Sequence, residues 1–492
     1  MNQNKIGLAW IKEQFILDDI KIDTECFAAK ISSINKEDMQ CHLYPESYRP
    51  KDTVVEQLKF ALKYESLNLR CLSALFKKPD IDKEIEKALV SSPGSKYNRL
   101  IGFYYEFLTN KSLQTQKLLT GNYIDAVNKD SYYVAPSIKE QKFRVNNNLT
   151  GNGMLTMLIH RNEKLLKDDE LKLLLIESVS GYPVEFLDRA TRYLISKETK
   201  SSNEIEAESI SPNKLIKFIF ALETINNEEL TKEKLIDTLN IIKEKHYHEF
   251  DYRVEQNYLG DSGFNYIGSI DYVPPKPFDA HELMDEWFLV RNKVLQSDMP
   301  SIVKAAALSS SFVFIHPFMD GNGRISRYIM QDTLYRMGVI DKQCSLPLSS
   351  GLLLELKKYY DVLNEKSQKI MEYVDFHLDD NGGLTVNGDT ADLYRHLSFD
   401  SDALFLSNIA KKVTQELVPK EMEKLKLFDS IFQNLKENID LPNKDISLIT
   451  TLLMNNKGKI SIKKRKGVLG HIHAVSLNYA EQVYEETFYS LI

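Results

Sequence analysis

The sequence predicts a mainly α-helical protein. Residues 302–315 (IVKAAALSSSFVFI) form an apolar run without glycine or proline, which is typical of a largely buried helix. Residues 324–338 (RISRYIMQDTLYRMG) predict a second helix that ends near Gly338, a residue suited to a helix C-terminus. Helix-like patterns also occur on both sides of this pair, over 54–78, 80–90, 97–109 and 164–195, and again beyond about 393.

Three regions separate along the chain. Residues 1–195 are expected to form an N-terminal helical region, interrupted by an irregular stretch at 120–153 that is rich in Asn, Tyr and Gly. Residues 196–213 (SKETKSSNEIEAESISPN) have the polar composition of a linker or exposed loop and end at a proline. The next boundary is expected near 378–392 (LDDNGGLTVNGDTAD), which is dense in Gly, Asp and Asn, so a central domain is expected over 214–377.

Residues 378–492 are expected to form a C-terminal helical region. Within it, 445–466 read as a helix, a turn and a basic element, with six basic residues in the ten positions 457–466. This arrangement suits a winged-helix-like element that faces DNA or a protein partner, and it equally suits a solvated turn. DNA contact is the less favoured of these interpretations.

Residues 316–327 (HPFMDGNGRISR) are the most informative segment of the chain. Pro317 disfavours helical geometry at His316, so the chain is expected to turn there and to place His316 at the mouth of a loop. The residues that follow tolerate tight turns and positive φ angles: Asp320, Gly321, Asn322 and Gly323. A glycine-rich turn that leads into a helix N-terminus directs free N–H groups at one point and predicts an anion site, above all for phosphate.

The side chains around this turn suit phosphoryl chemistry. Arg324 and Arg327 lie three positions apart on one helix face, where two guanidinium groups can grip phosphate oxygens. Asp320 offers a hard oxygen ligand for Mg²⁺, which needs few protein ligands when a nucleotide supplies the others. His316, with an ordinary pKa of about 6.5, can accept a proton from a hydroxyl near neutral pH.

This segment resembles the signature of the Fic family, His-Pro-Phe-x-(Asp/Glu)-Gly-Asn-Gly-Arg-x-x-Arg, and every fixed position of the pattern is filled. The likeness is to long bacterial Fic proteins. It implies a compact helical core of the Fido fold within 214–377, with a short β-hairpin flap. It also implies a protein adenylyltransferase that transfers AMP from ATP, with Mg²⁺, to a Ser, Thr or Tyr hydroxyl of a protein.

The resemblance assigns a role to each motif residue. His316 would be the general base, Phe318 would anchor the loop in the core, and Asp320 would hold Mg²⁺. The remaining residues would bind the nucleotide, with the turn around the phosphates and the arginines at the departing pyrophosphate: Gly321, Asn322, Gly323, Arg324 and Arg327.

The likeness extends to both sides of the motif. Residues 252–275 resemble the segment that ends in the flap, whose Ile267, Gly268, Ser269 and Ile270 would pair with the backbone of the target protein as an added strand. Tyr360 resembles a tyrosine near the nucleotide base. The later Asn-x-Gly-Asp pattern of the family is missing from 363–368 (LNEKSQ), which leaves the adenine contacts undefined.

Many Fic proteins carry an inhibitory glutamate in a helix with the pattern (Ser/Thr)-x-x-x-Glu-(Gly/Asn), which pairs with the second arginine of the motif. The strict pattern is absent from this chain, because the one Glu followed by Gly or Asn is Glu437 and Gln433 precedes it by four positions. A looser candidate for the inhibitory residue is Glu223, in the segment FIFALETINN.

Composition agrees with a soluble globular enzyme. The chain has 492 residues, of which 43% are hydrophobic and 27% charged, and its formal net charge of -7 argues against a surface that coats nucleic acid. The four cysteines, Cys26, Cys41, Cys71 and Cys344, have no metal-site or disulfide spacing. No run reaches the roughly 18 apolar residues of a membrane span and no signal-peptide pattern occurs, so cytoplasmic residence is expected, with a leaderless secreted effector as the alternative.

Two classes of function remain open from the sequence. The first is a Fic transferase, in which UMP, phosphate or phosphocholine transfer are alternatives to AMP transfer. The second is a nucleotide-sensing regulatory or DNA-binding protein with a slow Fic core. A P-loop kinase is disfavoured, because no Gly-x-x-x-x-Gly-Lys-(Ser/Thr) occurs. The expected partner is a protein with a modifiable hydroxyl, and self-modification and a homo-oligomer are further expectations.

Overall fold

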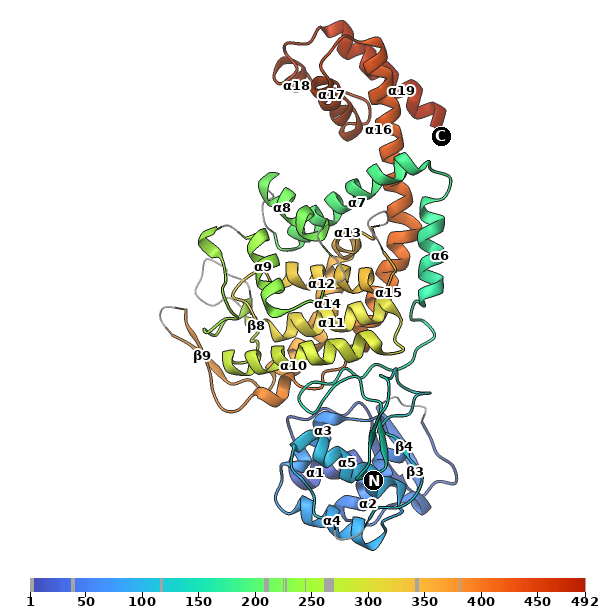
Figure 1. Cartoon of the computed structure of the whole chain (residues 1–492), viewed down its shortest axis with the longest axis vertical. Coiled ribbons are helices and arrows are strands. Elements are labelled where there is room, and N and C mark those ends of the chain that lie inside the picture. The colour runs from blue at the N-terminus through green and yellow to red at the C-terminus, as the bar shows by residue number, and fades with distance from the viewer. Residues whose placement is uncertain are drawn as a thin grey trace.

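The computed structural model describes residues 4–36, 40–115, 118–207, 212–223, 225, 228–243, 245–260, 270–340, 345–379 and 382–491. The chain is mainly helical, with small sheets of two or three strands. Figure 1 shows an elongated molecule with the N-terminal unit at one end, the C-terminal unit at the other and the largest helical body between them.

The N-terminal unit joins two small sheets to a group of helices. In the first sheet β2 (Glu25–Ala29) pairs with β1 (Asn4–Ile6) antiparallel and with β3 (Cys41–Pro45) parallel. In the second, β6 (Val145–Asn147) lies between β4 (Ile124–Asp125) and β5 (Ile138–Glu140). The helices of this unit are α1 (Leu8–Phe15), η1 (Glu46–Tyr48), α2 (Val54–Tyr64), α3 (Leu69–Phe76), α4 (Ile81–Ser91) and α5 (Lys96–Thr109). One apolar cluster unites most of these elements, from Leu8 to Leu149.

The central body is built around α11 (Ser301–Ile315), which is buried on nearly all sides because its residues are almost uniformly apolar or small. Next to it lie α10 (Pro277–Gln296), α12 (Asn322–Arg336) and α15 (Asp400–Lys412) (Figure 1). The other helices of this body are α6 (Asp168–Val179), α7 (Val184–Ile205), α8 (Pro212–Glu223), α9 (Lys232–Ile242), η2 (Lys245–Tyr247), α13 (Leu348–Leu354), α14 (Leu356–Met371) and η3 (Ala391–Tyr394). Two hairpins complete it, β7 (Leu259–Gly260) with β8 (Ile270–Tyr272) and β9 (Phe376–Leu378) with β10 (Leu384–Val386).

A long helical segment connects the central body to the C-terminal unit. It begins with a π-helical turn, η4 (Val413–Leu417), and continues as α16 (Val418–Asn438). Met422 still belongs to the central core, whereas Leu427 begins a separate apolar cluster. That cluster is completed by α17 (Asn443–Asn455) and α19 (Ala474–Leu491), together with Ile460, Leu469 and Ile472 on either side of the short helix α18 (Ile462–Lys466).

The structure corrects the expectation of a linker at 196–213, because residues 196–205 form the second half of α7. Their polar composition has another cause. Five polar residues of this half are buried: Glu198, Thr199, Ser201, Ser202 and Asn203. Glu198, Ser201 and Ser202 bond to side chains of α12 and α13, whereas Thr199 and Asn203 donate to carbonyls of α7 itself. The central core also extends beyond 214–377, from Tyr133 to Met422 in the first turns of α16.

No helix in the described part of the chain combines the length and the apolar character that a bilayer crossing requires.

Candidate functional site

The motif segment forms a loop between the two helices at the centre of the molecule. Helix α11 ends at His316, which adopts a left-handed conformation with φ of 51°. Helix α12 begins directly after Gly321, whose φ is 91°. Helix α12 ends as expected, since Gly338 has a positive φ and the Val339 N–H donates back to the Leu334 carbonyl. The motif therefore lies at a sharp reversal between two buried helices.

His316 has the geometry of a proton acceptor. Its side chain is buried, and Nδ1 lies 3.2 Å from the Val313 carbonyl oxygen. Because a carbonyl can only accept, Nδ1 must donate there, which leaves Nε2 as the basic nitrogen. Burial lowers the pKa of His316 to about 4, so the imidazole is neutral at physiological pH.

Internal contacts hold the motif loop, the catalytic loop expected from sequence, in shape. The Asn322 side chain accepts from the Phe318 N–H at 3.0 Å and donates to the Phe318 carbonyl at 2.7 Å. Phe318 is fully buried, and its ring packs near those of Tyr252 and Phe312. Since both hydrogen-bonding groups of the Asn322 amide are used inside the loop, phosphate contacts at this position would come from the backbone.

The glycine turn lies beside the two arginines. The Arg324 guanidinium is buried and pairs with the exposed Asp320 carboxylate at 3.1 Å. The buried Lys243 ammonium lies 3.9 Å from the same carboxylate. At Gly323 a β-carbon would lie 3.2 Å from Arg327 Nη1, so the second arginine reaches the edge of the turn. These positive groups and the N–H groups of the turn are suited to bind an anion.

Arg327 is held by the end of α7. Its Nε donates to Ser202 Oγ at 2.6 Å, and its Nη2 donates to the Ser202 carbonyl at 2.8 Å. The same Nη2 pairs with Glu206 at 2.7 Å. Glu206 Oε1 also lies 2.1 Å from the point where a Gly323 β-carbon would be, so this carboxylate sits directly over the glycine turn.

Sequence reasoning missed Glu206. Ser202 and Glu206 have the spacing Ser-x-x-x-Glu, but Ala207 stands where the pattern has Gly or Asn. Ala207 nevertheless adopts the left-handed conformation, with φ of 53°, that Gly or Asn usually takes. A search for (Ser/Thr)-x-x-x-Glu without the final Gly or Asn would have found Glu206. Glu223, the candidate from sequence, is exposed at the end of α8, and Glu206 is the residue paired with Arg327.

The stem of the predicted flap is tied to the catalytic loop. Strands β7 and β8 pair antiparallel, with Leu259 opposite Tyr272. Arg253 is buried beside them; its N–H donates to the Pro317 carbonyl at 2.8 Å and its Nε to the His316 carbonyl at 2.9 Å. Its Nη2 donates to the Pro275 carbonyl. Of the predicted flap residues, Ile270 is in β8, whereas Ile267, Gly268 and Ser269 lie outside the described residues.

Tyr360 lies at the opposite side of the site, on α14. Its hydroxyl donates to the Ile205 carbonyl at 3.4 Å, so it contacts the last turn of α7. Tyr359, its neighbour, is buried and its ring lies parallel to that of Phe405.

The side chains around Asp320 determine how it could bind Mg²⁺. Among the residues that the structure describes, no group of three or more His, Cys, Asp or Glu side chains is placed to hold a metal ion. Asp320 is therefore a single hard oxygen donor at the edge of the anion site. This fits Mg²⁺, which keeps several waters and takes phosphate oxygens together with one or two carboxylates.

The C-terminal basic element is partly neutralised within its own unit. Arg465 pairs with Glu481 at 2.7 Å, and Lys459 pairs with Glu485 at 3.0 Å. Helix α19, the long helix after this element, has the acidic residues Glu481, Glu485 and Glu486 and no Lys or Arg. A helix of this charge is poorly suited to base recognition in a DNA groove.

Known proteins resemble parts of this chain. The model of the Fic/DOC family matches residues 229–334. The protein adenylyltransferase Fic of Drosophila ananassae is 40% identical over 82 residues, and that of Drosophila willistoni is 39% identical over the same length. Each alignment covers 16% of this chain and 16% of the relative, so the chain spans only a small part of the curated relatives that it matches.

Two solved structures were also found. A Fic family protein from Desulfovibrio desulfuricans G20 has 14% sequence identity and a TM-score of 0.38, covering 63% of this chain and 88% of its own. A Fic domain containing signaling protein from Bacteroides thetaiotaomicron VPI-5482 has 18% identity and a TM-score of 0.35, covering 52% of this chain and 96% of its own. The match at 229–334 contains the loop at 316–327, so this part of the chain is a Fic/DOC family domain.

Proposed function

We propose that the protein is an adenylyltransferase that moves AMP from ATP to a Ser, Thr or Tyr hydroxyl of a protein. The observation that carries the proposal is the position of His316. Its basic Nε2 is available at the start of a glycine turn that has Arg324 and Arg327 on the following helix. A base beside an anion site is what the transfer of a phosphorus group to a hydroxyl requires.

The reaction follows from this arrangement. His316 Nε2 takes the proton of the target hydroxyl as its oxygen attacks the α-phosphorus of ATP. The bond from that phosphorus to the oxygen bridging toward the β-phosphorus then breaks, and pyrophosphate leaves with the electron pair. The N–H groups of the turn and the two arginines bind the phosphates and the departing charge. Asp320 would hold Mg²⁺, which neutralises phosphate charge when it is bound.

The same site is held in a restrained state by Glu206. Its carboxylate pairs with Arg327 and lies over Gly323, where it competes with phosphate for the same cationic group and the same space. We propose Glu206, at the end of α7, as the inhibitory glutamate of this chain in place of Glu223. Productive ATP binding then needs the end of α7 to move away from Arg327.

Other elements would position the substrates. The hairpin of β7 and β8 would align the target backbone beside His316, since Arg253 links its stem to the catalytic loop. Tyr360, half exposed at the end of α7, would lie near the adenine.

The test uses the Glu206→Gly variant with Mg²⁺ and ATP labelled separately at the α- and γ-phosphates, followed by intact mass. We expect α-label and an AMP-sized gain on the protein itself or on an added target. Adding His316→Ala should reduce labelling by about 10² to 10⁴-fold and leave ATP binding intact. Wild type should label more slowly than Glu206→Gly.

Each alternative chemistry gives a different result. Label from the γ-phosphate would indicate phosphorylation, and a gain of mass only with UTP or CDP-choline would indicate UMP or phosphocholine transfer. ATP binding without transfer from any donor would indicate a nucleotide sensor. Unchanged labelling in the His316→Ala variant would reject His316 as the base.

A further inference from the structure

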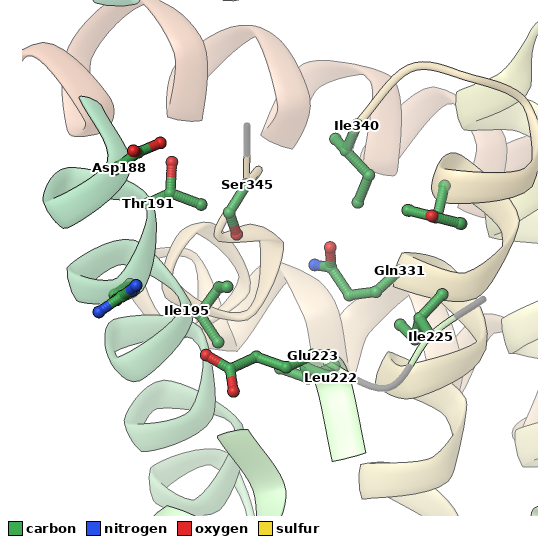
Figure 2. A pocket seen from close by; sticks show the side chains of 11 residues that line it. Asp188, Thr191, Ile195, Leu222, Glu223, Ile225, Gln331, Ile340 and Ser345 are labelled. Atoms are coloured by element: carbon green, nitrogen blue, oxygen red, sulfur yellow. The ribbon is translucent and has the colours of Figure 1, made fainter. Parts of the chain in front are cut away.

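A cavity of about 330 Å³ opens behind the inhibitory helix, between α7, α8 and α12. Figure 2 shows Gln331, Ile340 and Ser345 directed into the space between these helices, with Ile195 on the α7 side. Its size is within the range of small-molecule sites in proteins. The catalytic loop does not line it, so the proposed reaction leaves the cavity without a role.

The cavity and the inhibitory contact share one face of α7. Asp188, Thr191 and Ile195 line the cavity at helical spacing, and the same face continues one turn at a time through Glu198 and Ser202 to Glu206 just past the helix end. Whatever shifts or fixes this face at the cavity therefore acts on the face that holds Arg327.

Helix α12 lies opposite this face of α7. Arg327, Gln331 and Tyr335 are spaced four residues apart, with Arg327 at the inhibitory contact and Gln331 and Tyr335 at the cavity. The Gln331 Nε2 donates to Glu198 at 3.2 Å. Glu198 accepts two further hydrogen bonds from Ser349, which tie α7 to α13. The hydrogen bond between Gln331, at the cavity, and Glu198, on the α7 face that leads to Glu206, thus connects the two places.

The lining defines the chemistry of a ligand. The inner walls are apolar, with Ile195, Leu222, Ile225 and Ile340. The lining also includes the exposed residues Asp188, Glu223 and Arg192, two acidic and one basic, so its formal charge is negative. An apolar body with an ammonium group matches both features, because the body replaces water at the walls and the cation meets the carboxylates.

We propose that this cavity is a regulatory site for a small amphipathic amine, whose binding holds α7 against α12 and keeps Glu206 on Arg327. The direction follows from the structure, since the cavity exists in the state in which Glu206 and Arg327 are paired. A ligand that binds this state stabilises it. The amine and ATP are then antagonists, and each weakens the binding of the other by the same factor. The regulatory part of this inference rests on the proposed role of Glu206.

Binding is tested by calorimetric titration of the full-length protein with three probes that share one aromatic body: tryptamine, tryptophan and indole-3-acetate. We expect tryptamine to bind most tightly and indole-3-acetate most weakly. The double variant Asp188→Asn, Glu223→Gln should lose about tenfold in affinity for tryptamine. Glu185→Gln removes an exposed carboxylate of α7 outside the cavity and should leave the affinity unchanged.

The order of the three affinities shows which chemical class of ligand the cavity prefers. Equal binding of indole-3-acetate and tryptamine would overturn the assignment to a cationic ligand. The absence of saturable heat for all three probes would overturn the site. An equal loss in the Glu185→Gln variant would place binding elsewhere on α7.

The coupling is tested with ATP binding, which does not depend on transfer. Saturating tryptamine should weaken the affinity of the wild type for ATP at least threefold and should leave that of Glu206→Gly unchanged. An unaltered ATP affinity in the wild type would overturn the regulatory role. If ATP affinity responds as expected but no label is ever transferred, the proposed reaction fails while the regulatory site stands.

Discussion

His316 is a buried imidazole with one nitrogen bound to a backbone carbonyl and the other basic. It adopts the left-handed conformation at the end of α11, directly before Pro317, and its Nδ1 contacts the Val313 carbonyl in the last turn of that helix. Burial depresses the pKa, which keeps the ring neutral and ready to accept a proton.

This depressed pKa predicts an unusual pH profile. A histidine whose pKa lies near 4 keeps its basic form on going from pH 8 to pH 6, whereas an ordinary histidine of pKa 6.5 would lose about fourfold in basic form. We expect the transfer rate of the Glu206→Gly variant to change less than about twofold over this range. A fourfold fall with a midpoint near pH 6.5 would show that His316 titrates as a solvated imidazole.

Gly323 gives a second prediction at the scale of one residue. A β-carbon there would approach Glu206 to 2.1 Å and Arg327 to 3.2 Å, so the position is open only to glycine while α7 is docked. In the Glu206→Gly background that clash is absent, and Gly323→Ala then tests the phosphate site alone. We expect a loss of about tenfold in ATP affinity by calorimetry, about 1.4 kcal/mol, because phosphate can no longer approach the backbone closely. Unchanged affinity would contradict the phosphate role of the turn.

At the scale of elements, the decisive feature is that α7 docks through polar side chains. Glu198 is fully buried, and burial raises its pKa to about 7 although three hydrogen bonds from Ser349 and Gln331 favour the ionised form. A helix held in this way releases more readily than one held by a continuous apolar face, which suits a part that must move.

Glu198 therefore predicts a pH dependence of stability. Its pKa rises from 4.5 to about 7 on folding, so the folded protein binds more protons between these values and its stability falls as the pH rises through this window. Relative to Glu198→Gln, the wild type should lose up to about 3 kcal/mol between pH 4.5 and 7. Melting temperatures of both proteins across this range provide the measurement, with Glu185→Gln as the control. Parallel curves would mean that folding does not raise the pKa of Glu198.

The elements also show what sequence can and cannot predict here. The helices around 316–327 were predicted because apolar periodicity and a proline define them locally, and the left-handed Gly338 follows from its place after a helix. The docking of α7 was not, because its Thr, Ser and Asn residues have the composition of a loop. Ser201 and Ser202, together with Glu198, find their partners on α12 and α13, more than a hundred residues away, whereas Thr199 and Asn203 bond within α7. Glu206 was missed for a related reason. Its role is indicated by its contact with Arg327, and the residue after Glu206, which the sequence pattern uses, does not reveal that contact.

At the scale of the whole molecule, the N-terminal unit and the central body meet across a seam that combines polar contacts with the burial of Tyr133 in the central core. Asp298 accepts from the Val134 N–H at 2.7 Å, donates from its own N–H to the Val134 carbonyl at 3.0 Å and pairs with Arg161. His160 pairs with Asp400 at 2.8 Å across the same seam. Each side has its own apolar cluster, so the seam contributes less to stability than either core.

This division predicts that the chain does not unfold in one step. We expect calorimetry to resolve more than one thermal transition, and Asp298→Ala to lower the transition of the N-terminal unit by breaking the seam. The matched variant Asp130→Ala, at an exposed position of the neighbouring loop, should leave the transitions in place. A single transition that shifts as a whole would show that the units fold cooperatively.

The backbone conformation of Ala207 destabilises the arrangement in which Glu206 pairs with Arg327. An alanine in the left-handed region costs roughly 1–2 kcal/mol relative to the right-handed one, and this cost weighs against the arrangement in which Glu206 covers Gly323. Under the proposed restraint by Glu206, we therefore expect a fraction of molecules to be unrestrained at rest, and basal labelling would measure that fraction. Ala207→Gly removes the strain and should lower basal labelling about fivefold or more, while the rate of the Glu206→Gly protein should not respond to it. We therefore expect the basal rate of labelling to stay above zero and to depend on one methyl group, the side chain of Ala207.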